Sequence, residues 1–335
     1  MRLFPTILIG VALAGPALAN DSSAELTTGG LVLTKNDNIE LRSEDLSISE
    51  REIVVRYKFF NHGQNDDAIT VAFPLPDIVW DGPDANISIP DPDAENFLDF
   101  KTRVEGAPVD MRLERKAFAH DKEITDKLTA LGVPLGPQSA ATGKKLDALP
   151  KATQDDLVDQ GIAIPDDYDA GKGWEHHFAP NWTLKTTYYW RQTFPAGREL
   201  SVEHRYRPSV GETAGTELQS EALAPDRLKA YEQRYCVDRA FLNGLSAASG
   251  KRDANGAWQH YLFESRIAYV LTTGANWAGP IGDFHLIIDK TSPDRLISFC
   301  EDGVKKISPT QFEVRHMNFT PRRDLDILIL AQPRR

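Results

Sequence analysis

Apolar and polar residues alternate along much of the first half of the chain. Apolar side chains take every second position in 53–59, and the alternation recurs in 69–73 before Pro74. A period of two places alternate side chains on one face of an extended strand, which is typical of half-buried β-structure. Proline lacks the donor that a sheet ladder needs, so Pro74 should end the second strand. We expect these two strands to form a hairpin.

The same alternation predicts two further pairs of strands. One pair is 97–104 and 111–115, joined by the turn Glu105-Gly106-Ala107-Pro108. The other pair is 184–194 and 199–207, joined by Pro195-Ala196-Gly197, and it gives the clearest hairpin signal in the sequence. Later strands are expected at 258–271, 284–288, 312–317 and 325–330.

In the middle of the chain the period changes to that of a helix. Asp121 can cap a helix that ends at Gly132, and a second helix should follow Pro150 and end near Gly161. The polar segment 136–145 between them is expected to be a mobile loop. We interpret this region as an insertion that serves as a lid over a site, as a docking arm for a partner, or only as a cap on a sheet face.

The combined pattern predicts a mainly β fold. We expect an antiparallel β-sandwich-like architecture with a helical insertion and a mixed α+β C-terminal part. The expected division is 1–19 as signal peptide, 20–115 as the first half of the sandwich, 116–173 as the helical insertion, 174–210 as a β-hairpin that completes the sandwich, and 211–335 as a disulfide-linked α+β region.

The first residues have the features of a signal peptide. Arg2 precedes the apolar run 3–13, and Ala17-Leu18-Ala19 provides the small residues that a signal peptidase recognises. The run is broken by proline and glycine and is shorter than the ~20 residues that a spanning helix needs. We therefore expect cleavage between Ala19 and Asn20, export of the protein, and no transmembrane anchor in its mature form.

The chain has two cysteines, Cys236 and Cys300. In an oxidising compartment they should form one disulfide, which would stabilise the fold by roughly 4 kcal/mol on the chain-entropy model. A reactive or metal-binding thiol is the alternative, but no Cys-x-x-Cys pair supports it. Two helices are expected on either side of Cys236, one opened by Pro225 and one capped by Asp238.

Composition and charge exclude several classes of protein. The chain has 335 residues, of which 41% are hydrophobic and 26% charged, so it can bury a sizeable core. Its formal net charge of −11 repels nucleic acid and anionic lipid. We therefore expect no nucleic-acid partner.

Aromatic and histidine side chains form the densest group of residues suited to binding. Exposed rings could stack on a sugar or an apolar ligand, and imidazoles could bind a metal or donate hydrogen bonds. The alternative is that the rings fill the core between sheets. The candidate ligand-binding residues are Trp174, His176, His177, Trp182, Tyr188 and Trp277.

Sequence motifs for metal, cofactor and nucleophile are missing. His176 and His177 are adjacent, so on a strand they point to opposite faces and cannot both bind one ion. The sequence has no Gly-x-Ser-x-Gly elbow, no Ser-x-x-Lys pair and no phosphate-binding glycine loop. We predict no metal, no cofactor and no catalytic residues, although paired carboxylates for glycoside hydrolysis stay open.

Several ordered motifs resemble one known family. They are Ala72–Pro76, Tyr188–Pro195, Tyr235-Cys236-Val237-Asp238 and Asn276–Phe284. Together they resemble the domain-of-unknown-function family numbered 4424. The resemblance implies an exported, periplasmic protein and supplies no established chemistry.

Three functions agree with these features. We favour non-catalytic binding of a ligand, an envelope component or a protein partner, since the aromatic loops offer contact surface without a nucleophile. One alternative is an envelope hydrolase, glycosidic or peptidic. The other is a structural or assembly protein that docks another exported chain.

Overall fold

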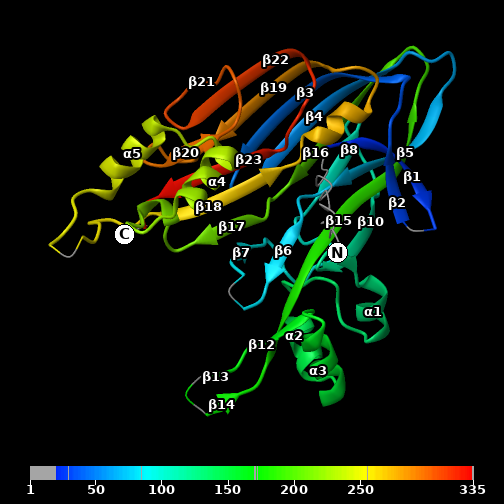
Figure 1. Cartoon of the computed structure of the whole chain (residues 1–335). Helices are drawn as coiled ribbons and strands as arrows, with labels where there is room; N and C mark the ends of the chain where they lie inside the picture. The colour runs from blue at the N-terminus through cyan, green and yellow to red at the C-terminus, as the bar shows by residue number, and fades with distance from the viewer. Residues whose placement is uncertain are drawn as a thin grey trace, which may run out of the picture.

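Two large β-sheets pack face to face and enclose the main core of the protein (Figure 1). The computed structural model describes residues 20–28, 30–83, 85–169, 171, 173–254 and 256–333. The expected signal peptide, with Ala19 at its cleavage site, therefore lies outside the described residues. Most of the sheet pairings are antiparallel, so the predicted mainly β class is confirmed.

The first sheet has eight strands. Its path runs β11 (Lys122–Glu123), β10 (Arg112–Ala119), β15 (Phe178–Phe194), β5 (Asp67–Pro74), β1 (Ser22–Thr27) and β2 (Gly30–Thr34), and both β6 (Ile78–Asp81) and β12 (Ala163–Pro165) pair with β15. The long β15 is the spine of this sheet, because four other strands hydrogen-bond to it.

The second sheet also has eight strands and joins the two ends of the chain. Its order is β21 (Lys305–Lys306), β22 (Gln311–Phe319), β19 (Ile281–Asp289), β3 (Ile39–Ser49), β4 (Ile53–Asn61), β16 (Glu199–Tyr206), β8 (Lys101–Val104) and β9 (Ala107–Pro108). β3 and β19 pair in parallel. The C-terminal strands thus extend a sheet that the N-terminal strands begin.

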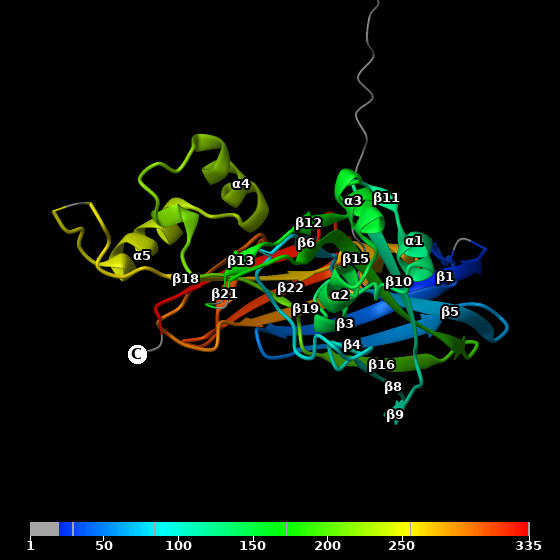
Figure 2. The same cartoon turned by 90° about the horizontal axis from the view of Figure 1, so that it is seen from below.

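A third sheet carries the C-terminal helices, which project to one side in Figure 2. It consists of β20 (Leu296–Phe299), β23 (Leu325–Ala331), β18 (Phe263–Tyr269), β17 (Val210–Thr213) and β7 (Ile87–Ser88). A short 3-10 helix, η1 (Glu217–Gln219), precedes these helices. A second one, η2 (Thr272–Asn276), follows β18. Among the described residues, no helix is long and apolar enough to cross a membrane.

The predicted hairpins are wrong, although most of the predicted strands form close to the expected positions. The strands expected at 97–104 and 258–271 are shorter, since they form only as β8 and β18. β4 pairs with β3 and β16, whereas β5 pairs with β15 and β1, so the chain crosses between sheets after Asn61. The chain crosses again between β15 and β16. It also crosses between β8 and β10, which lie in opposite sheets. Each strand buries one face, so its alternation is the same whether the next strand lies beside it or across the core.

The helical insertion contains α1 (Thr125–Ala130), α2 (Ala140–Asp147) and α3 (Lys151–Asp159). Asp121 does not cap α1; with a φ of 62° it lies in the turn between β10 and β11, and the helix begins after Ile124. The expected loop 136–145 is also wrong, because Ser139 caps α2 there by accepting a hydrogen bond from the amide of Ala141. Gly132 and Gly161 follow α1 and α3 at positive φ, as expected.

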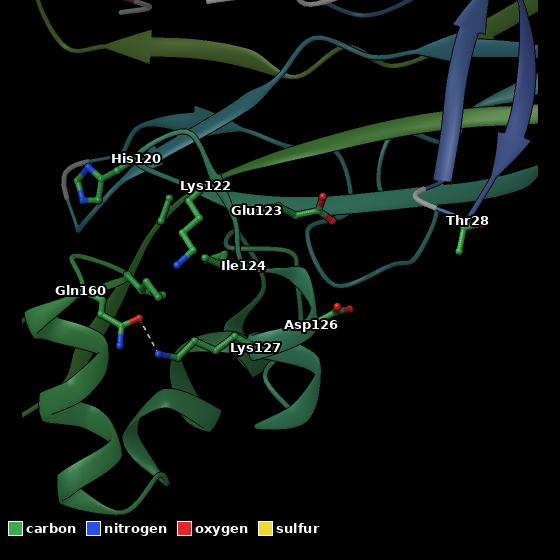
Figure 3. Close-up of a pocket in the computed structure, with 10 residues that line it drawn as sticks. Thr28, His120, Lys122, Glu123, Ile124, Asp126, Lys127 and Gln160 are labelled. Atoms are coloured by element: carbon green, nitrogen blue, oxygen red, sulfur yellow. Dashed lines mark hydrogen bonds between the residues drawn. The ribbon is translucent and has the colours of Figure 1, made fainter. Parts of the chain in front are cut away.

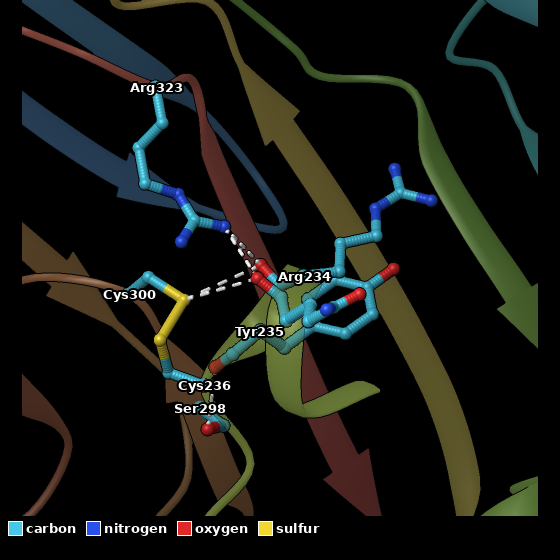
Figure 4. Close-up of a disulfide and its surroundings, with 7 residues drawn as sticks. Arg234, Tyr235, Cys236, Ser298, Cys300 and Arg323 are labelled. Carbon is cyan, nitrogen blue, oxygen red and sulfur yellow. Dashed lines mark hydrogen bonds between the residues drawn. A yellow bond between two sulfur atoms is a disulfide. The ribbon is translucent and has the colours of Figure 1, made fainter. Parts of the chain in front are cut away.

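The predicted disulfide between Cys236 and Cys300 is confirmed, with a Cα–Cα distance of 5.1 Å (Figure 4). It joins the end of α4 (Pro225–Tyr235) to the residue after β20. The guanidinium of Arg323 donates to the carbonyls of Gln233 and Arg234 at 2.9 and 3.0 Å, which satisfies the open end of α4. As expected, Asp238 caps α5 (Arg239–Ser249), and its side chain accepts from the amide of Phe241 at 2.7 Å.

Candidate functional site

Residues 120–182 form an arm that projects from the sandwich (Figure 1). The arm contains the three helices, β12, and a two-stranded hairpin of β13 (Tyr168–Asp169) and β14 (Trp174–Glu175). The first residues of β15 lead from the hairpin back into the first sheet. The hairpin therefore lies at the end of a continuous strand that is anchored in the main core.

The arm has a small hydrophobic core of its own, separate from the main core. Trp182 is 2% exposed in this core, and its indole nitrogen donates to the carbonyl of Leu135 at 2.8 Å. Leu128, Leu146 and Leu157, one from each helix, pack in the same cluster. This packing fixes the helices on β15, so the arm is a built element rather than a loose loop.

Trp174 lies at the tip of the arm and is 73% exposed. The carboxylate of Asp169, its partner across the hairpin, accepts hydrogen bonds from the amides of Gly171 and Gly173 at 2.7 and 3.0 Å. Both glycines have positive φ, which this tight loop requires. The loop geometry thus holds the large indole ring out toward solvent.

His177 fastens the hairpin to α2. Its Nδ1 lies 2.8 Å from Asp147 Oδ2 at the end of α2, and its Nε2 lies 3.2 Å from Glu175 Oε2. Asp147 and Glu175 raise the pKa of His177 by accepting hydrogen bonds from the ring. The ring also stacks on Tyr168, with centroids 4.9 Å apart. His177 therefore contacts both strands of the hairpin and the helix, and its protonated form donates to both carboxylates.

His176 points away from this contact, as expected for adjacent residues in extended backbone. Its Nδ1 lies 3.0 Å from Asp167 Oδ1, and its side chain is 78% exposed. Within the described ranges, no three His, Cys, Asp or Glu side chains are placed to hold a metal ion. In contrast to His176, both ring nitrogens of His177 lie close to carboxylate oxygens, so the ring is positioned to donate hydrogen bonds to them.

The structure brings three of the six candidate residues together and separates the others. Trp174, His176 and His177 lie at the tip, and Trp182 lies inside the arm. Tyr188 is 4% exposed in the main core, where it stacks on Phe100 with centroids 4.4 Å apart. Trp277 is fully buried in the same core, 4.8 Å from the ring centroid of Phe59. Burial favours a packing role for Trp182, Tyr188 and Trp277.

The sequence patterns do not identify the partners of His177. Asp147 is 30 positions away in the chain and belongs to a helix that was expected to be a loop. Tyr168 and Glu175 pair across the hairpin, whose two strands are too short to show alternation. Only the closeness of Glu175 to His177 in sequence could have suggested this contact.

The segment 147–177 of the arm, which includes the hairpin, is strongly acidic. Residues 147–177 contain eight Asp and Glu residues but only two lysines. Asp166, Asp167 and Asp169 precede the tip, and Glu175 follows Trp174. Close carboxylates of one sign produce a negative potential that attracts cations.

A pocket of about 680 Å³ opens at the base of the arm (Figure 3). Lys127 lines it and donates to Gln160 and Asp156 at 2.7 and 2.8 Å. Lys122 and Glu123 contribute charges of both signs. Charged side chains of both signs therefore line this pocket.

The chain belongs to the family described as Domain of unknown function (DUF4424), whose model matches residues 19–328. The resemblance inferred from the sequence motifs is thereby confirmed. No curated protein matches the chain. Among solved structures it is similar to a "putative nutrient binding protein" from Legionella pneumophila subsp. pneumophila str. Philadelphia 1, with 14% identity and a TM-score of 0.40 over 93% of this chain and 70% of the other.

Proposed function

We propose that this DUF4424 protein is an exported, periplasmic binding protein that uses the tip of its arm to hold a cationic partner. The observation that carries the proposal is the exposure of Trp174, which is 73% accessible on the hairpin of β13 and β14. A tryptophan left in water forfeits the burial of a large apolar surface, and such residues are frequent hot spots of interfaces. The loop that presents this ring is fixed by Asp169.

Charge around the ring supports a cationic group as its target. The face of an indole attracts cations. Carboxylates beside the ring attract the same cation through charge-assisted hydrogen bonds. Asp167, Asp169 and Glu175 lie on the same hairpin or next to it. A segment of an exported protein that carries lysine or arginine fits this combination of ring and acids.

The shape of the site favours a macromolecule over a small ligand. Small molecules bind in concave sites that bury most of their surface. The hairpin instead projects from the body of the protein (Figure 1). A projecting tip inserts into a partner, as exposed loops on rigid scaffolds commonly do.

Site-specific crosslinking tests the proposal in the native host. A photoreactive phenylalanine analogue replaces Trp174 in one variant and Met317, which is 68% exposed on β22, in a matched control. We expect a discrete adduct from position 174 only, whose crosslinked peptide is rich in lysine or arginine. The purified partner should bind the Trp174→Ala variant at least tenfold more weakly, and its affinity should fall as salt is added.

Two results would overturn this function. One is the same adducts from positions 174 and 317, since the tip would then make no specific contact. The other is a specific partner whose crosslinked segment is acidic or uncharged, because the acidic hairpin would then not explain the recognition.

A further inference from the structure

The first described residues enter the core of the sandwich although all of them are polar. Asn20, Asp21 and Ser22 are completely buried. The hydroxyl of Thr273 donates to the carbonyl of Asn20 at 2.7 Å, and the indole nitrogen of Trp277 donates to the carbonyl of Asp21 at 2.7 Å. Side chains of η2 and of the residue that follows it therefore hold the backbone at the start of the chain inside the fold.

The cluster around this start contains two buried carboxyl groups, those of Asp21 and Glu44. His204 Nε2 lies 2.9 Å from Asp21 Oδ1, and the side-chain amide of Asn20 donates to Glu44 Oε2 at 3.0 Å. All of these side chains are fully buried. Tyr57 donates to Asn20 Oδ1, and its hydroxyl lies 3.1 Å from that of Tyr269. Phenols and amides solvate the cluster but carry no positive charge.

Positive charge in the cluster does not balance the two carboxyls. His204 is the one basic side chain that contacts them within the described residues, and its other ring nitrogen lies 2.8 Å from the hydroxyl of Thr102. Asp21 Oδ2 is buried and has no hydrogen-bond partner among the described residues. A buried acceptor without a partner costs free energy, and an unpaired buried carboxylate costs more.

Asn20 itself can supply the missing positive charge. We infer that this cluster is a binding site for the α-ammonium group that cleavage between Ala19 and Asn20 creates, so that removal of the signal peptide completes the fold. The inference depends on the expected cleavage site and is independent of the proposed role of the arm. Asn20 is completely buried and contacts Glu44 and Tyr57 through its side chain, so its main-chain nitrogen is buried in the residue that joins this cluster.

The chemistry of processing supplies what the cluster lacks. A signal peptidase adds one water molecule across the Ala19–Asn20 amide: Ala19 leaves with the carboxylate, and Asn20 keeps the nitrogen as a primary amine. The amine takes a proton from solvent, because the pKa of an α-amino group lies at ~8 and a nearby carboxylate raises it. An amide nitrogen has at most one hydrogen to donate, whereas the ammonium has three and carries the charge that balances the second carboxyl.

Burial also dictates the order of events. A peptidase acts on an exposed and extended segment, whereas Asn20 has no accessible surface in the folded protein. Cleavage must therefore precede the docking of β1 into the first sheet. Without the ammonium, burial raises the pKa of Glu44 to about 8, so the group would be held protonated in a chain that retains an amide at Asn20.

The experiment compares two forms of the mature protein. One begins at Asn20 with a free amine, and the other keeps two additional residues, Gly-Ser, before Asn20. We expect a Tm higher by about 5 °C or more for the free amine, because the extended form lacks the ammonium group that pairs with the buried carboxyls. In the Glu44→Gln background this difference should shrink by at least half, whereas Glu25→Gln, an exposed position on β1, should leave it unchanged.

A second measurement does not require any variant to fold. The form that begins at Asn20 is treated with an amine-reactive acetylating reagent near neutral pH, and its N-terminal peptide is analysed by mass spectrometry. We expect the α-amine to be protected at least tenfold relative to the same protein in urea. Equal Tm values, a difference that Glu44→Gln does not reduce, rapid labelling of the amine, or a natural N-terminus other than Asn20 would each overturn the inference.

Discussion

Asn61 donates its side-chain amide to the carbonyl of Phe194 at 2.9 Å and thereby ties the end of β4 in one sheet to the end of β15 in the other. The same nitrogen also donates to the carbonyl of Asn65 at 3.0 Å, and its carbonyl oxygen accepts from the amide of Gly63 at 2.7 Å. Two of the connections between the sheets, the one after β4 and the one after β15, thus meet at one buried side chain.

Replacement of Asn61 should therefore destabilise the sandwich. We expect Asn61→Ala to lower the free energy of unfolding by about 2–3 kcal/mol, because it leaves the buried carbonyl of Phe194 without a donor. Urea unfolding measures the change. Asn65→Ala is the control, since its side chain is exposed and should cost less than about 0.5 kcal/mol. Equal effects of the two substitutions would contradict the role of Asn61.

Trp182 and Trp174 should respond in opposite ways to truncation. Trp182→Ala removes the centre of the core of the arm and a hydrogen bond to Leu135, so we expect a loss of ~3 kcal/mol or more. Trp174→Ala should change stability by less than about 0.5 kcal/mol, because the ring is mostly in solvent. Thermal and urea unfolding of both variants test this, and a large loss from Trp174→Ala would mean that the tip is packed rather than free.

The contact of the hairpin with α2 should weaken at high pH. The pKa of His177 is raised by Asp147 and Glu175, so the contact is fully present below the ordinary value near 6.5 and is lost as pH rises through the raised value. We expect amide exchange in residues 163–178, corrected for its intrinsic pH dependence, to be slower at about pH 6 than at about pH 9.

Matched variants isolate this effect. Asp147→Asn keeps an acceptor for the amide of Phe178 but removes the charge, so the pH step should become smaller. His176→Gln alters the neighbouring imidazole, whose contact is with Asp167, and should leave the step in place. If the difference in amide exchange between low and high pH persists when both Asp147 and Glu175 have lost their carboxylates, the titrating group is not His177.

Loss of the disulfide should be costly because of the length of the loop it closes. Cys236 and Cys300 are 64 positions apart, so the chain-entropy model assigns the bond about 4 kcal/mol. We expect the Cys236→Ala, Cys300→Ala double variant to unfold at a lower urea concentration by a corresponding amount. Arg323→Ala, which removes only the donor to the exposed end of α4, should cost about 1 kcal/mol or less. Equal unfolding midpoints for the double variant and the native protein would contradict this prediction.

The strands could be predicted from the sequence because each of them buries one face. Ile53, Val55, Tyr57 and Phe59 are all fully buried or nearly so, as the alternation requires. Their partners could not be predicted, since alternation records which face is buried and not which strand lies alongside. The turn after Phe194 therefore has the same signal whether it closes a hairpin or crosses the core.

Other elements lacked any pattern that could reveal them. Helix α2 contains Gly143 and only one large apolar residue, Leu146, so its stability comes from the Ser139 cap and from packing on β15. The buried start of the chain is equally hidden, because Asn20, Asp21 and Ser22 have the composition of a loop. Of the candidate site, the sequence indicated the aromatic and histidine tip but not the carboxylates that position it.

The parallel pairing of β3 with β19 makes the order of synthesis matter. Ser43 is paired with Asp283, some 240 positions later in the chain. During synthesis the first strands emerge well before their neighbour, so one side of β3 stays open until the last quarter of the polypeptide has followed. An open strand edge invites pairing with other chains. The interval before the C-terminal segment closes the sheet is therefore the stage at which the growing chain is most open to pairing with other molecules.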